Sequence, residues 1–169
     1  MKVLIITGSA GTGKSTLSIS VSEVLKHLRS EIISTDDIRQ LLRIEKPDET
    51  EVHFPLSKMT EEQWFLQSNR VMNTVGKMIQ FYQEKGRQLV IVEGINALQN
   101  PLKNIEELEV KSVFVNPKEG YTARLVSNNM EPKAGWVTIQ EHLSKQDYDL
   151  VLDTDLSSTG ISQIIQMIS

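Results

Sequence analysis

The stretch TGSAGTGKST, residues 7–16, decides how this chain folds. The residues before it, KVLII (2–6), form an apolar run typical of a buried strand. The residues after it, LSISVSEVLKHL (17–28), repeat apolar side chains at helical spacing, which predicts a helix over about 14–29. The three glycines therefore lie on a tight turn from a strand into a helix.

This turn satisfies the pattern G-x-x-x-x-G-K-[ST], which by composition alone would occur by chance in roughly one chain in a hundred of this length. Glycines let the backbone bring its N–H groups close to an anion, and the helix N-terminus adds unpaired donors. Such a loop is typical of nucleotide phosphate binding, with Lys14 reaching the β- and γ-phosphates and Ser15 ligating Mg²⁺. The residues expected to contact the nucleotide are Gly8, Ser9, Ala10, Gly11, Thr12, Gly13, Lys14, Ser15 and Thr16.

The composition of the 169 residues is that of an ordinary globular protein, with 24% charged and 39% hydrophobic residues. There are no cysteines, which excludes disulfides and thiolate chemistry, and no apolar run is long enough to cross a membrane. A net charge of -4 gives no basic footprint for nucleic acid. We expect a cytoplasmic protein, and the sequence does not indicate an oligomeric state.

Strands and helices alternate along the whole chain, which predicts an α/β three-layer sandwich in one domain, residues 1–169. Strands are expected at 2–6, 31–34, 88–94, 109–116 and 149–152. Helices are expected at 14–29, 35–43, 60–86, from 117 toward 130, at 138–146 and at the end of the chain, with a long loop over 45–59. Thr60 is a suitable N-cap for the longest helix, and Gly86 a suitable residue after its end.

A second candidate feature is STDDIR, residues 34–39, at the end of the second strand. Ligands of open α/β sheets bind beyond the carboxyl ends of the strands, so this segment should lie near the phosphate-binding turn. There Asp36 could accept the proton of a substrate hydroxyl, and Arg39 could hold an anionic group of that substrate. The alternative is that Asp36 caps the helix and Arg39 is a solvated surface residue.

In four places the chain resembles the small P-loop kinases of the nucleoside-monophosphate-kinase-like group: GSAGTGKST, STDDIR, VIVEGINAL and LDTDLS. Within that group, IISTDDIRQLLR and VIVEGINALQNP are most similar to 2-phosphoglycerate kinases. The DDIR element is also similar to that of polynucleotide 5'-hydroxyl kinases and zeta-toxin-like enzymes. The first of these matches is specific, and the later two are weaker individually.

The resemblance implies the P-loop NTPase fold, with a five-stranded parallel sheet in the order 2-3-1-4-5 and a short lid at about 124–140. It also implies ATP and Mg²⁺ as cofactors and transfer of the γ-phosphate to a hydroxyl of a small anionic acceptor. Asp36 would be the general base and Arg39 the ligand of the acceptor's anion. Glu93 would contact Mg²⁺ through water or orient the acceptor; its alternative is a carboxylate that caps the loop at the strand end.

The lid of such kinases usually presents two or more arginines that stabilise the transferring phosphoryl group, and here the sequence departs from the family. Arg124 is the only arginine after Arg87. Asn128, Asn129 and Lys133 could substitute in part. Arg124 could also be a surface helix residue, and DTDLSSTG (153–160) could either wrap an adenine base or simply begin the last helix.

Two other functions remain open from the sequence: a kinase for the 5'-hydroxyl of nucleic acid, and a nucleotide-binding protein without efficient phosphotransfer. The acidic net charge weighs against the first, and the sparse lid is the support for the second.

Other side chains are expected to be structural. The aromatic residues of the longest helix are predicted to lie in the core, and the three histidines are predicted at the surface without metal-ligand spacing: Trp64, Phe65, Phe81 and Tyr82, and His27, His53 and His142.

Overall fold

A computed structural model describes residues 1–55, 58–103, 105–116, 134–153 (backbone only for 134–138) and 158–169. The strands are β1 (Lys2–Thr7), β2 (Glu31–Ser34), β3 (Leu89–Glu93), β4 (Glu109–Asn116) and β5 (Leu150–Asp153). The helices are α1 (Lys14–Val24), α2 (Thr35–Glu45), α3 (Glu61–Glu84), α5 (Ala134–Leu143) and α6 (Ser158–Ile168). Short 3-10 turns cover Lys26–Leu28, Thr50–His53 and Asn100–Leu102.

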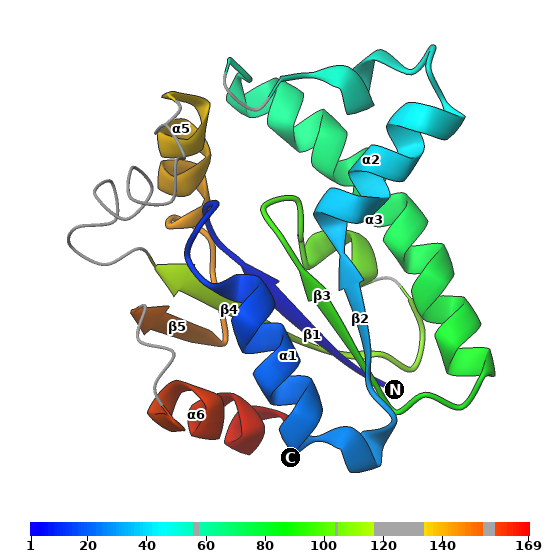
Figure 1. The fold of residues 1–169 in the computed structure, drawn as a ribbon, viewed down its shortest axis with the longest axis vertical. Helices are drawn as coiled ribbons and strands as arrows, with labels where there is room; N and C mark the ends of the chain where they lie inside the picture. Colours follow the sequence, from blue (N-terminus) through cyan, green and yellow to red (C-terminus); the bar gives the residue numbers. More distant parts are fainter. Residues whose placement is uncertain (56–57, 104, 117–133, 154–157) are drawn as a thin grey trace.

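The five strands form one parallel sheet in the order β2-β3-β1-β4-β5 (Figure 1), which confirms the predicted topology. Successive residues of a strand point to opposite faces of the sheet. On β1, Val3 and Ile5 therefore join a core that includes α2 and α3 residues, whereas Leu4 and Ile6 join a core that includes α1 and α6 residues. These two cores give the three layers of the α/β sandwich.

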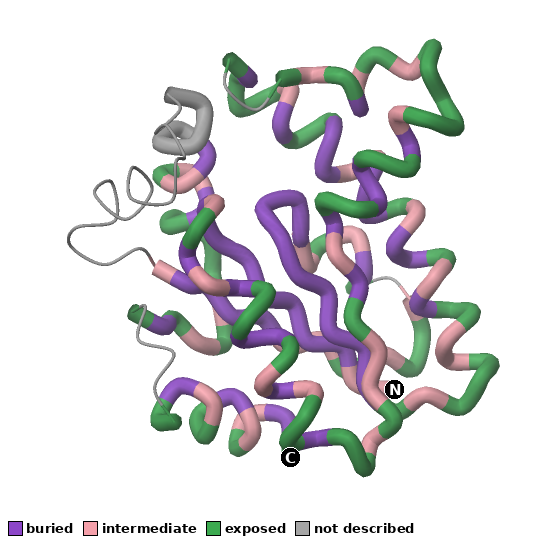
Figure 2. Tube along the Cα trace, viewed as in Figure 1, coloured by how far each residue is buried: buried purple, intermediate pink, exposed green. Residues whose placement is uncertain are grey.

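The central strands are the most buried part of the molecule (Figure 2), and every residue of β3 is buried. A third apolar cluster packs α5 against the start of α3 and the end of β4, through Ile139, Leu143, Trp64 and Phe114. Because these clusters hold both faces of the sheet, the carboxyl ends of β1, β2 and β3 lie in fixed positions beside one another.

Local sequence signals explain most helix boundaries. Thr60 and Gln63 form a reciprocal capping box at the start of α3, and Gly86 follows its end with a φ of +70°. The stretch 45–59, predicted as loop, contains the 3-10 turn Thr50–His53. The helix predicted at 138–146 is in fact Ala134–Leu143, and the one predicted from 117 toward 130 lies outside the described residues.

Two predictions about aromatic side chains were wrong. Trp64 is fully buried and Tyr82 packs against the core, but Phe65 and Phe81 on the same helix are about half exposed, at 47% and 52%. The helix α3 is amphipathic, and Phe65 and Phe81 lie outside the face whose side chains are buried. His27 and His53 are exposed as predicted, whereas His142 is only partly exposed.

Within the described residues, no helix combines the length and the apolar character needed to cross a bilayer.

Candidate active site

The phosphate loop, residues 8–16, begins where β1 ends and runs into α1. Gly8, Gly11 and Gly13 all have positive φ, at +147°, +77° and +89°. A Cβ on Gly8 would lie 2.5 Å from the carbonyl oxygen of Val115, so only glycine lets the loop pass this close to β4. Gly13 occupies the N-cap of α1 in the left-handed conformation and has no side chain to cap the helix. The first N–H groups of α1 are therefore left for a ligand.

Inside the loop, the carbonyl oxygen of Ser9 accepts two hydrogen bonds. Lys14 Nζ donates to it at 2.6 Å and Thr12 Oγ1 at 3.0 Å. All three residues are buried. Burial lowers the pKa of Lys14, and the nearby carboxylates of Glu93 and Asp36 oppose that change. The loop thus holds a buried cation whose charge is only partly compensated, which favours an anionic ligand.

Glu93 ends β3 directly beside the loop and is only 7% exposed. Its Oε1 accepts a hydrogen bond from Ser15 Oγ at 3.2 Å. Burial raises the pKa of Glu93, while the charge of Lys14 and hydrogen bonds from Ser15 and Ser34 act in the opposite direction. The structure thus brings together the two residues that the sequence suggested for Mg²⁺, Ser15 and Glu93.

Asp36 lies in the first turn of α2, near enough to Lys14 and Glu93 for its charge to act on both. Its side chain is 53% exposed. The alternative that Asp36 caps the helix is wrong, because Ser34 is the N-cap and accepts a hydrogen bond from the Asp37 N–H. Asp36 is thus a carboxylate near the phosphate loop that pairs with Arg39 and does not cap the helix.

Arg39 is 7% exposed, so the alternative of a solvated surface arginine is also wrong. Its Nη2 pairs with Asp36 Oδ1 at 3.2 Å, but within the described part of the chain its buried Nε and Nη1 have no hydrogen-bond partner. Burial lowers the pKa of Arg39. Arg43 lies one turn further along α2, and unlike Arg39 its guanidinium has backbone partners: it donates to the carbonyl oxygens of Val52 and Phe54.

Gly94 sets the position of α2 relative to β3. It has a φ of +133°, and a Cβ there would overlap Thr35 Oγ1 in the first turn of α2. Because Glu93 and Asp36 are neighbours in sequence of Gly94 and Thr35, this close packing determines how near the two carboxylates come. No motif in the sequence indicates this contact.

Side chains of α3 hold the turn that follows Gly94. Trp64 Nε1 donates to the carbonyl oxygen of Ile95 at 3.2 Å, and Asn96 Nδ2 donates to Ser68 Oγ at 2.8 Å. The Oδ1 of Asn96 is buried and has no partner among the described residues. Nothing in the local sequence pattern distinguishes these residues from ordinary helix and loop positions.

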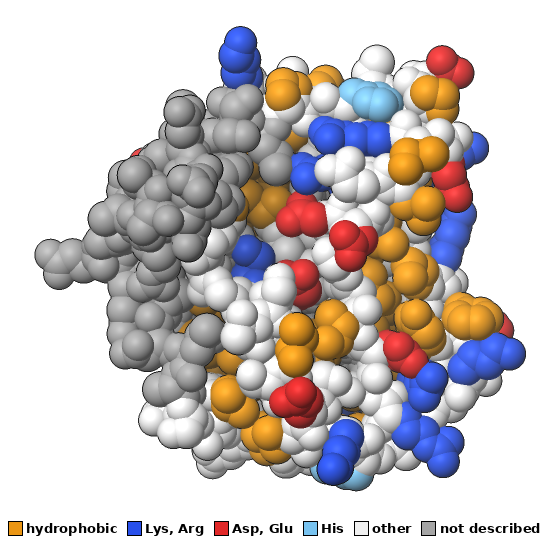
Figure 3. Space-filling model, in the orientation of Figure 1, with side chains coloured by type: hydrophobic (Ala, Val, Ile, Leu, Met, Phe, Trp, Pro, Cys, Tyr) orange, Lys and Arg blue, Asp and Glu red, His pale blue; other side chains and the backbone are white. Residues whose placement is uncertain are grey.

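Figure 3 shows where these groups reach the surface. Acidic side chains gather between α1 and α2, near the carboxyl ends of the central strands, and Lys or Arg side chains adjoin them. Among the described residues, no group of three or more His, Asp or Glu side chains could hold a metal ion by itself. Arg124, Asn128, Asn129 and Lys133 lie outside the described residues, as do Asp155 to Ser157 of the predicted adenine segment.

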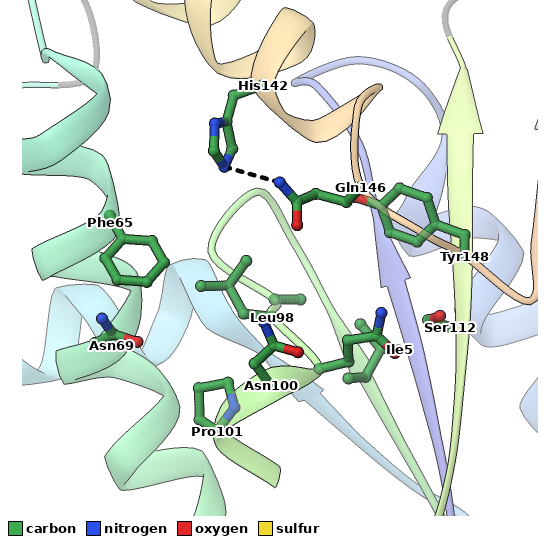
Figure 4. A pocket seen from close by; sticks show the side chains of 12 residues that line it. Ile5, Phe65, Asn69, Leu98, Asn100, Pro101, Ser112, His142, Gln146 and Tyr148 are labelled. Carbon is green, nitrogen blue, oxygen red and sulfur yellow. Dashed lines mark hydrogen bonds between the residues drawn. The ribbon is translucent and has the colours of Figure 1, made fainter. Parts of the chain in front are cut away.

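A separate small pocket of about 50 Å³ lies away from the phosphate loop (Figure 4). His142 and Gln146 lie over one side of it and Phe65 of α3 over another. No residue of the phosphate loop lines it, so the pocket carries no part of the site described above.

No protein-family model and no curated protein sequence matches this chain. Solved structures do resemble it. A tunicamycin resistance protein of Deinococcus radiodurans has a TM-score of 0.69 at 15% identity, over 99% of this chain and 95% of that one. A gluconokinase of Sinorhizobium meliloti has 0.59 at 14%, over 98% and 94%. The APS kinase of Mycobacterium tuberculosis in complex with AMPPNP and APS has 0.58 at 16%, over 98% and 96%. At these identities the likeness establishes the fold: this chain has the fold of the small P-loop kinases.

Proposed function

We propose that the protein is an ATP-dependent kinase that transfers the γ-phosphate to a hydroxyl of a small anionic acceptor. The observation that carries the proposal is the buried Lys14 in the phosphate loop with the Asp36 carboxylate on α2 near enough for its charge to act on that lysine. The fold likeness to a gluconokinase and an APS kinase supports the same class of reaction.

The residues that would hold the phosphates are those of the phosphate loop. The free N–H groups at the start of α1 would donate to the phosphate oxygens, and Lys14 would turn from Ser9 to the β- and γ-phosphates. Ser15 and Glu93 would hold Mg²⁺, since a hydroxyl and one carboxylate beside the phosphates are the oxygen ligands that this ion takes in kinases. Mg²⁺ would neutralise charge on the phosphates when bound.

On the acceptor side, Asp36 would take the proton of the acceptor hydroxyl as its oxygen forms a bond to the γ-phosphorus. The bond from that phosphorus to the bridging oxygen of ADP breaks in the same step, and ADP leaves. Arg39 would hold the acceptor's anionic group after its side chain turns toward the acceptor, since its Nε and Nη1, buried in this conformation, have no other partner among the described residues. A carboxylate or phosphate beside the hydroxyl meets this requirement, and 2-phosphoglycerate has both.

The experiment is a phosphotransfer screen with ATP and Mg²⁺ against hydroxy acids, sugars, nucleosides and 5'-hydroxyl oligonucleotides, with 2-phosphoglycerate included. We expect transfer to an anionic hydroxyl compound and none with Lys14→Met. Transfer only to oligonucleotides would favour a nucleic-acid kinase instead. Binding of ATP with no transfer to any acceptor would contradict the proposal.

A further inference from the structure

We propose that Gln140, on α5, is a positioning residue of the nucleotide site, which acts by fixing Ser9 in the phosphate loop. This inference rests on the proposed nucleotide binding but not on the identity of the acceptor. It assigns a role to a residue distant in sequence from the glycine-rich turn.

One oxygen of Gln140 accepts two hydrogen bonds from Ser9. Gln140 Oε1 accepts from Ser9 Oγ at 2.5 Å and from the Ser9 backbone N–H at 3.1 Å. Ser9 is 1% exposed, so the two donors of this residue depend on a protein acceptor. Gln140 supplies that acceptor across 131 residues of sequence.

The other side of Ser9 explains why its orientation matters. Its carbonyl oxygen accepts from Thr12 Oγ1 and from Lys14 Nζ. Every polar atom of Ser9 is therefore bonded, with Gln140 on one side and the loop's own lysine on the other. Gln140 holds the backbone N–H and the hydroxyl of Ser9, and a change in the Ser9 backbone conformation would move the carbonyl oxygen that holds Lys14.

Gln140 is itself held in place. Ile139 and Leu143, on either side of it in α5, are buried in the cluster that contains Trp64 and Phe114. His142 Nδ1 pairs with Glu61 Oε1 at 2.5 Å at the start of α3. A glutamine on a helix fixed in this way can constrain the loop, whereas one on a loose segment would only follow it.

The test measures binding of Mg²⁺·ADP by calorimetry to wild type and to Gln140→Met, which keeps the side-chain volume and removes the acceptor. The matched control is Gln146→Met, because Gln146 contacts His142 and not the loop. We expect about a tenfold rise in Kd for Gln140→Met, because a loop released from these two hydrogen bonds must be ordered when ADP binds, and no change for Gln146→Met. In the kinase assay, KM for ATP should rise while KM for the acceptor stays the same.

A coupling measurement separates positioning from general stability. Ser9→Ala should raise Kd by about two- to threefold, because a loop that keeps only the backbone contact to Gln140 has less to be ordered on binding than in Gln140→Met. The double variant should bind no more weakly than Gln140→Met, because both changes break the same contact. Additive effects would overturn the inference, as would ADP binding within twofold of wild type in a folded Gln140→Met. If Gln140→Met does not fold, wild-type affinity in Ser9→Ala overturns it.

The outcomes also distinguish this inference from the proposed function. Wild type that binds ADP but transfers no phosphate contradicts the kinase, while the effect of Gln140 on binding can still be measured. Active transfer with unchanged ADP binding in Gln140→Met contradicts the positioning role alone.

Discussion

The two sides of the candidate site are built in different ways. The proposed nucleotide side consists of consecutive residues, 8–16, with Glu93 beside them, and its glycines with positive φ present backbone N–H groups and one lysine. The proposed acceptor side consists of side chains from separate elements: Asp36 and Arg39 on α2, and the α3 residues that hold the turn after Gly94.

This difference determines how each side responds to substitution. A loop that binds through its backbone depends on conformation, and its key residues are those that permit the conformation. A site made from side chains on separate elements depends on how those elements pack, so a residue that binds nothing can be as important as one that does. The predictions below test this contrast in order of decreasing effect.

Asp36→Asn tests the acceptor side most directly. Asparagine keeps the shape of the side chain but cannot accept the hydroxyl proton, so turnover should fall by about 10²- to 10⁴-fold while the Kd for ATP is nearly kept. Asp37→Asn is the control, since Asp37 is the adjacent exposed carboxylate on the same helix turn. Equal losses in both variants would show that net charge, and not the position of Asp36, matters.

Gly94→Ala tests whether packing positions the acceptor side. The added Cβ would overlap Thr35 Oγ1 at a backbone φ of +133°, so we expect a loss of about 3 kcal/mol in the free energy of unfolding. In Gly86→Ala the φ is also positive but no atom lies within 4 Å, and about 1 kcal/mol should be lost. Urea unfolding measures both. Similar losses in the two variants would mean that the contact with Thr35 is unimportant.

Arg39→Met should separate binding from stability. The acceptor KM should rise by about 10- to 100-fold because a charged hydrogen-bonding partner is lost, while ATP binding is unchanged. Stability should stay equal or increase, since a buried cation with two unpaired nitrogens is removed. Arg43→Met is the control: its guanidinium holds the carbonyls of Val52 and Phe54, so this variant should be less stable than wild type. A loss of stability in Arg39→Met would contradict the view that Nε and Nη1 of Arg39 are buried without partners among the described residues.

Glu93→Gln should have the smallest effect on the fold, and the effect should depend on pH. Because the folded-state pKa of Glu93 is raised, wild type loses stability as pH rises from below the unfolded value, about 4.3, through the folded pKa. Glutamine does not ionise. The variant should therefore melt at a higher temperature than wild type at pH 7 and at the same temperature as wild type below about pH 4. A gap of equal size at both pH values would indicate a cause other than ionisation.

The sequence alone was sufficient for the phosphate loop, the alternation of strands and helices, and the strand order inferred from the family resemblance. Local chemistry controls these features: glycine permits positive φ, and apolar periodicity distinguishes strand from helix. The sequence also predicted that Asp36 and Glu93 lie at one edge of the sheet, because the carboxyl ends of parallel strands lie on the same side.

Only the tertiary structure revealed that Arg39 is buried with two nitrogens that no described residue pairs, that Gly94 packs on Thr35, and that Gln140 holds Ser9. These contacts join residues from separate elements, up to 131 positions apart, and no periodicity or motif records which side chains meet when helices pack on a sheet. Burial and pairing depend on contacts between elements that are distant in sequence, and therefore they cannot be predicted from a single amino-acid sequence by local patterns.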